Sequence, residues 1–278
     1  MRDNQKRIRR AAAEPPPQAC SPAPTGAGMS YVVPTEFVEL PSRGQFYSEG
    51  HPLFQQETIE IKFMTAKDED ILSSTALIKN GLVIDRLLES LMVQDIDPKT
   101  LLVGDRSAIM IAARISSYGP SYKASVDCPS CETDVEYIFD LKKTNLIQNC
   151  FDNKFLKKNS IEHDVDGAHF SITLPVSKVR IGLRPLDGDD EKLLGDIDED
   201  QLITSTLSLF ISSVNDSTDT DTIGTFIDNM PAADSKHVRG IYPDLVPTIN
   251  LKQEFVCENC LHHTDMEVPL SAEFFWPG

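Results

Sequence analysis

The chain has 278 residues, with 43 Asp and Glu against 26 Lys and Arg, and a formal net charge of −17 at pH 7. A surface of this sign repels nucleic acid and anionic lipid, so we expect neither a nucleic acid nor a membrane as a partner. The longest apolar cluster, residues 207–211, is too short to cross a bilayer, and the sequence shows no signal-peptide pattern. With six cysteines, these features predict synthesis in a reducing cytoplasm.

Residues 1–28 differ in composition from the rest of the chain. They hold five of the 26 basic and two of the 43 acidic residues, an alanine run and three consecutive prolines. This composition predicts a disordered tail. Two alternatives stay open: a basic arm that binds phosphate or a membrane, and an over-extended start in which Met29 is the true first residue.

The remaining residues divide into four segments that together predict an α+β fold. Residues 29–63 read as an N-terminal arm and first strand, and residues 64–141 as a helical segment that ends in a cysteine hairpin. Residues 142–178 read as a connecting β-hairpin region, and residues 179–278 as a second helical segment with a cysteine hairpin and an aromatic C-terminus. Apolar residues at helical spacing support one helix in each half. They are Ile84, Leu87, Leu88 and Leu91 in the first half, and Ile203, Leu207, Phe210, Ile211 and Val214 in the second.

Two cysteine motifs carry the clearest chemical signal in the chain. They are residues 128–131 (CPSC) and 257–260 (CENC), and alternating apolar residues follow each motif, as in a strand that leaves a tight turn. Four thiolates complete a tetrahedral zinc site with no position open for water or substrate, so the site we predict is structural. The predicted zinc ligands are Cys128, Cys131, Cys257 and Cys260.

Two other states of these cysteines stay open. The first is a disulfide or redox pair, although the redox motif places its cysteines at the start of a helix, whereas strand residues follow them here. The second is a set of free buried thiols. For the two other cysteines we expect ordinary roles, with Cys20 in the tail and Cys150 at a core position.

The two halves show signs of an internal repeat. Asp105 precedes Cys128 by the same number of residues as Asp234 precedes Cys257, and each aspartate is predicted to cap the N-terminus of a helix. Each half then reads as strand, helices and Cys-x-x-Cys β-hairpin, and the two hairpins meet in a split, zinc-ribbon-like site. We predict that residues 215–229, rich in Ser, Thr and Asp, form a loop insertion in the second copy.

The sequence contains no complete motif for catalysis or for calcium binding. The spacing of Asp196, Asp198 and Asp200 begins like an EF-hand loop, but Gln201 stands where glycine is required and Leu207 where the bidentate Glu belongs. No phosphate-binding glycine loop, nucleophile elbow or His-Glu-x-x-His helix occurs in the sequence. We therefore expect no enzyme and no small-molecule substrate. Five lysines near the first hairpin form the one basic patch, which we interpret as a solvated face: Lys142, Lys143, Lys154, Lys157 and Lys158.

Aromatic residues gather near both ends of the body. Phe46 and Tyr47 follow a proline- and glycine-containing bend, and Phe274, Phe275 and Trp276 crowd into the last five residues. Such side chains are buried either in the chain's own core or against another protein, since aromatic residues are enriched at interface centres. They are therefore candidate partner-binding residues.

Three blocks of sequence resemble the T4-type phage baseplate hub family. They are residues 38–47 (VELPSRGQFY), residues 63–72 (FMTAKDEDIL) and residues 274–277 (FFWP). With the cysteine motifs they span residues 36–278. The resemblance implies a bacteriophage protein that binds other hub or tail proteins, made in the bacterial cytoplasm and present in the tail baseplate of the virion if it is retained.

Several functions stay open at this point. The resemblance fits both a hub subunit and a non-virion assembly chaperone that leaves once the hub is built. From another class comes a zinc-ribbon regulator that binds nucleic acid, because paired-cysteine ribbons are frequent in such proteins. A thiol oxidoreductase is the remaining alternative.

Overall fold

The computed structural model describes residues 32–164, 169–195, 197, 201–270 and 272–275, and the predicted tail, Cys20 and Met29 lie outside them. The described residues beyond position 32 form one unit in which helices pack with small antiparallel sheets, so the α+β prediction is confirmed. No helix among these residues is long and apolar enough to span a membrane.

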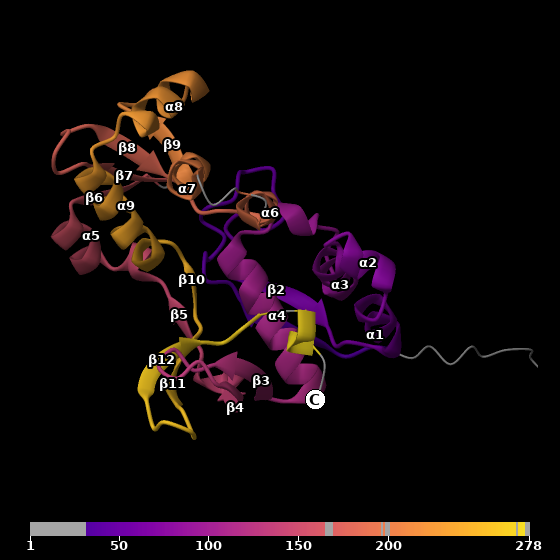
Figure 1. The fold of residues 1–278 in the computed structure, drawn as a ribbon. Coiled ribbons are helices and arrows are strands. Elements are labelled where there is room, and N and C mark those ends of the chain that lie inside the picture. Colours follow the sequence, from indigo (N-terminus) through magenta and orange to yellow (C-terminus); the bar gives the residue numbers. More distant parts are fainter. Residues whose placement is uncertain (1–31, 165–168, 196, 198–200, 271, 276–278) are drawn as a thin grey trace, which may run out of the picture. The chain divides into compact units, whose positions relative to one another are not determined.

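The first half begins with a β-hairpin and ends with another (Figure 1). Its elements are β1 (Thr35–Glu39), β2 (Thr58–Lys62), α1 (Ala66–Leu72), α2 (Thr75–Lys79), α3 (Val83–Leu91), α4 (Val103–Tyr118), β3 (Ser121–Asp127) and β4 (Asp134–Asp140). The helix predicted from the apolar spacing is present as α3, whose leucines at 87, 88 and 91 are fully buried. After α3 the chain returns to the sheet, where Met92 bridges Ile61 of β2.

A connecting segment and the second half follow the same general order. The elements are β5 (Asn145–Ile147), α5 (Asn153–Asn159), β6 (Ile161–Asp164), β7 (His169–Thr173), β8 (Arg180–Leu183), α6 (Gly188–Gly195), α7 (Leu202–Phe210), β9 (Ile211–Val214), α8 (Thr220–Asp228), α9 (Ala232–Leu245), β10 (Thr248–Asn250), β11 (Lys252–Val256) and β12 (His263–Glu267). Strands β6 to β9 form one antiparallel sheet in chain order. The segment boundaries inferred from sequence stay a prediction.

Two details of the sequence-based prediction are wrong in this half. Residues 215–229 are not simply a loop, because they contain α8, which buries Ile223 and Ile227. The predicted second helix ends at Phe210, and the residues up to Val214 form β9, which pairs with β8. In both places the tertiary contacts of apolar side chains override a composition that suggested otherwise.

The two halves are joined through α4. Strand β10 pairs with β5 and lies against α4, where the Cα of Gly104 approaches the backbone of Pro247 too closely for a side chain. Helix α6 also contacts the first half through ion pairs. Asp85 of α3 binds Lys192 of α6 at 2.5 Å and Arg106 of α4 at 2.7 Å. Although burial alone raises it, hydrogen bonds from Lys192 and Arg106 hold the pKa of Asp85 below its usual value.

Asp105 and Asp234 are not helix N-caps, contrary to the prediction. The caps are Leu102 and Pro231, and each aspartate is the third residue of its helix, with a fully buried side chain. The aspartate side chains accept hydrogen bonds from another segment. An aspartate suits a cap and the first turn equally well, so local sequence did not separate the two positions.

Asp105 holds the N-terminal arm on α4. Its carboxylate accepts hydrogen bonds from the Ser42 N–H at 3.0 Å, the Ser42 Oγ at 2.5 Å and the Tyr47 hydroxyl at 2.8 Å. The Tyr47 oxygen in turn accepts a hydrogen bond from the Leu102 N–H. Burial nevertheless raises the pKa of Asp105 above its usual value, because desolvation outweighs these bonds.

Asp234 does the same in the second half with an equivalent turn. Its Oδ1 accepts a hydrogen bond from the Val176 N–H at 2.8 Å, and its Oδ2 accepts one from the Ser177 N–H at 2.9 Å. Ser42 and Val176 each follow a buried leucine and a proline that end a strand. These matching contacts support an internal duplication, which stays a prediction.

We predict that Asp105→Ala lowers the free energy of unfolding by about 2–4 kcal/mol, because it leaves three buried donors without an acceptor. Asp219→Ala is the matched control, since Asp219 caps α8 at the surface with a bond to the Thr222 N–H, and its loss costs about 1 kcal/mol. Urea unfolding of both variants measures the difference. Equal destabilisation would show that the buried aspartate has no special part in holding the arm.

Candidate metal centre

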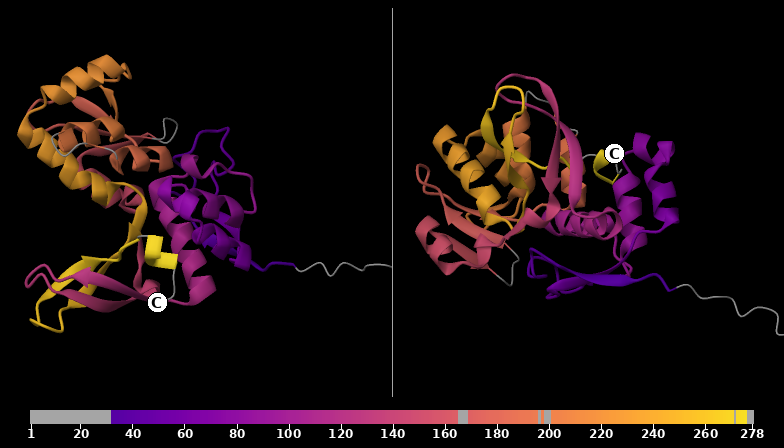
Figure 2. Two further views of the ribbon diagram at one scale, coloured as in Figure 1. Left: turned by 45° about the vertical axis from the view of Figure 1, so that its right-hand side comes forward. Right: turned by 90° about the horizontal axis from the view of Figure 1, so that it is seen from below.

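Two antiparallel hairpins carry the four predicted ligands. Strands β3 and β4 close at the pair Asp127 and Asp134, and β11 and β12 close at Val256 and His263. The turns between them hold the cysteine motifs. Figure 2 shows the two hairpins side by side in both views.

The two turns have the same backbone geometry. The N–H of Cys128 donates to the Thr133 carbonyl at 3.0 Å, and that of Cys257 donates to the His262 carbonyl at 3.0 Å. The residue after the second cysteine then takes a left-handed conformation, with φ of 54° at Glu132 and 58° at Leu261. Each turn therefore presents its two sulfurs on one side of a tight loop.

The four sulfurs converge in one cluster, in which every sulfur lies within 4.8 Å of the others. Cys128 and Cys260 are 3.7 Å apart, and Cys131 and Cys257 are 3.8 Å apart. A tetrahedral ion with Zn–S bonds of about 2.3 Å separates its ligand sulfurs by about 3.8 Å. A disulfide requires about 2.05 Å, so these distances fit metal coordination and not a disulfide.

The hairpins also contact each other below the sulfurs. The Tyr137 hydroxyl donates to the Glu254 carbonyl at 2.9 Å, and the Tyr137 ring meets that of Phe255 edge-on at 5.0 Å. The Gln253 amide exchanges two hydrogen bonds with the backbone of Asp140. The cysteine cluster thus lies next to packed contacts between the two hairpins.

Polar groups beside the sulfurs adjust their charge. Hydrogen bonds from Thr133 lower the pKa of the Cys131 thiol to about 6. The backbone N–H of His262 lowers the pKa of Cys260, but desolvation and the neighbouring sulfurs raise it to about 12. Four thiols this close cannot all ionise without a cation among them, which is the charge that a divalent metal supplies.

Sequence inspection singled out the four cysteines of this cluster but missed the residues that contact them or link the two hairpins. The Asn259 amide lies 3.1 Å from Thr133 Oγ1 and 3.8 Å from Cys131 Sγ, so it bridges the two turns. Because Asn259 lies inside the second cysteine motif, its position in the sequence could have indicated a contact with the site. Gln253 gave no signal, because its partner lies 113 residues away.

The other predicted site residues lie in the chain's own core. Phe46, Tyr47, Phe274 and Phe275 are all buried, and Trp276 lies outside the described residues. The guanidinium of Arg114 in α4 donates to the Phe274 carbonyl at 2.9 Å, which fixes the C-terminal turn. Core packing was one of the two alternatives for these aromatics; a partner contact stays a prediction. Cys150 is a buried core residue, as expected, and burial raises its pKa to about 12.

A family model shows which family the chain belongs to. The family model described as T4 bacteriophage base plate protein matches residues 33–276. The chain belongs to this family. The match covers both cysteine hairpins and all four predicted metal ligands of this base plate protein. No curated protein and no solved structure shows a significant match.

We predict that the purified base plate protein holds about one zinc ion per chain, measured by plasma mass spectrometry. Cys131→Ser should remove most of the zinc and lower the free energy of unfolding by about 3 kcal/mol or more, because the remaining thiolates no longer neutralise and enclose the ion. Ser130→Ala, in the same turn with an exposed side chain, is the control and should keep the zinc. Wild-type protein that binds no zinc and resists chelators unchanged would rule the site out.

The left-handed residues give a second prediction. Leu261 is 71% exposed, so a change there alters backbone strain more than packing. Leu261→Gly should keep or raise the melting temperature, since glycine adopts this conformation without strain, whereas Leu261→Val should lower stability by about 1 kcal/mol or more. Thermal unfolding of the zinc-loaded protein tests this. Ile138→Val, at an exposed position of β4, is the control, and a Leu261→Val effect no larger than the control's contradicts the strain argument.

Proposed function

We propose that this protein is a component of the baseplate hub of a contractile-tail phage and works by binding other hub or tail proteins. The observation that carries the proposal is the family match over residues 33–276, nearly the whole described chain. The resemblance of residues 38–47, 63–72 and 274–277 to the hub proteins supports the hub among the parts of a baseplate. The protein acts in the bacterial cytoplasm during assembly and stays in the virion tail if it is retained.

In this proposal zinc is structural. Four cysteine ligands fill the tetrahedral positions, so no position is left for a substrate or a reactive water. The ion then serves to hold together two hairpins whose cysteine motifs start 129 residues apart in the chain. The proposed role is therefore not catalytic: the protein binds neighbouring proteins through its surface.

The net charge of −17 supports protein partners over nucleic acid. A zinc-ribbon regulator needs a basic surface around its metal site. Here the two hairpins carry several acidic residues, among them Asp134, Glu136, Glu254 and Asp265. Polyphosphate would be repelled from such a surface.

Affinity copurification from infected cells tests the proposed function. A tagged wild-type chain should bring down baseplate proteins identified by mass spectrometry, and Ser130→Ala should do the same. Cys131→Ser should lose solubility or recover much less of these partners, because the two hairpins no longer hold a fixed geometry. Recovery of nucleic acid in place of baseplate proteins would contradict the proposal.

Mass spectrometry of purified virions separates the two forms of the hub role. A structural subunit should be present at a fixed ratio to other baseplate proteins. An assembly chaperone should be missing or far below stoichiometry.

A further inference from the structure

A groove of about 550 Å³ runs between α5 and α9, away from the metal centre. In Figure 1 these two helices lie beside the sheet formed by β6 to β9. Helix α9 contributes Lys236, Gly240 and Asp244, which lie on one face because they are spaced four residues apart, and the adjacent Ile241. The groove therefore follows the axis of α9.

The floor of the groove is apolar and open. Ile241 is buried, Phe155 of α5 is half-buried, and both line the groove. A Cβ placed on Gly240 would meet no heavy atom within 4 Å, so the space above this glycine is free in the described part of the chain. A partner helix can approach closely at such a position.

The rim of the groove is basic in an otherwise acidic protein. Lys158 and Lys236 line it with exposed side chains, and Lys154 and Lys157 are exposed nearby on α5. Among the described residues, the lysines that form ion pairs are Lys99, Lys123 and Lys192, so the groove lysines are left unpaired. Asp244 is the one acidic side chain in the lining.

We propose that this groove binds an acidic amphipathic helix of a partner protein. Unpaired ammonium groups on the rim attract carboxylates, and the apolar floor buries the hydrophobic face of a helix laid along α9. A nucleic acid fits less well, since the chain's net charge of −17 repels it. The inference extends the proposed protein-binding function to one defined surface.

A synthetic peptide tests the groove without any knowledge of the natural partner. The probe is a labelled helical peptide with leucines on one face and glutamates on the other, titrated by fluorescence anisotropy at physiological salt against the zinc-loaded protein. Gly240→Leu should weaken binding about tenfold, because the new side chain fills the groove, while helix propensity keeps α9 folded. Gly224→Leu in α8, where a Cβ also meets nothing within 4 Å, is the matched control and should bind within about twofold of wild type.

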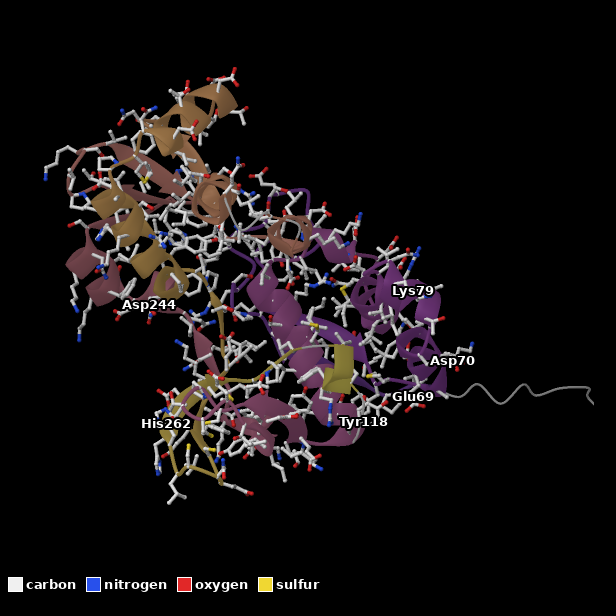
Figure 3. All side chains as sticks on the ribbon, viewed as in Figure 1. Glu69, Asp70, Lys79, Tyr118, Asp244 and His262 are labelled. Atoms are coloured by element: carbon white, nitrogen blue, oxygen red, sulfur yellow. The ribbon has the colours of Figure 1, made fainter. Side chains whose placement is uncertain are left out.

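Charge reversal gives an independent arm of the test. Lys158→Glu with Lys236→Glu should weaken binding about tenfold, and the loss should shrink as salt is raised. Lys67→Glu with Lys79→Glu is the control of equal charge, and Figure 3 shows Lys79 far from Asp244 of the groove. Equal weakening by both pairs, or no effect of Gly240→Leu, would overturn the proposal. Tighter binding of a single-stranded oligonucleotide than of the peptide would overturn it in favour of nucleic acid.

Discussion

The convergence of four sulfurs from two distant hairpins is the constraint on which the arrangement of this protein depends. Thiols within 4.8 Å of one another are stable as thiolates only around a cation, so the cluster ties the position of residue 128 to that of residue 257. The chain between them contains the connecting segment and most of the second half. The cluster therefore closes a loop of well over a hundred residues in the folded chain, and an ion bound there would restrict the unfolded chain as well.

Two buried aspartates also hold together segments that are far apart in the sequence. Asp105 and Asp234 each lie in the first turn of a helix, and the buried carboxylate of each binds a leucine-proline turn that precedes the helix in the chain. A buried carboxylate is costly unless its oxygens are hydrogen-bonded, so these two positions fix where each turn can lie. Each aspartate thus fixes one turn, and the four cysteine sulfurs bring the two hairpins together.

The acidic body of this chain is consistent with the proposed role of binding other proteins. Among the described residues, the aromatics Phe46, Tyr47, Phe274 and Phe275 are buried in the chain's own core. What varies across the surface is charge. The basic groove between α5 and α9 stands out against the net charge, and such contrasts direct partners by steering and by rejecting unsuitable ones.

The sequence by itself determined the two cysteine turns, the buried face of α3 and the α+β class, because each depends on residues within one or two turns of chain. The family resemblance rested on short matching blocks of sequence and not on a physical argument. Tertiary structure alone decided the role of Asp105, whose partner Ser42 lies 63 residues away, and the inward packing of Phe46 and Phe274. It also decided that α8 forms in a stretch rich in Ser, Thr and Asp, since two buried isoleucines there find a core that local composition does not reveal. Contacts between residues far apart in sequence leave no local pattern, and for that reason the α5–α9 groove had no signal beyond a few lysines.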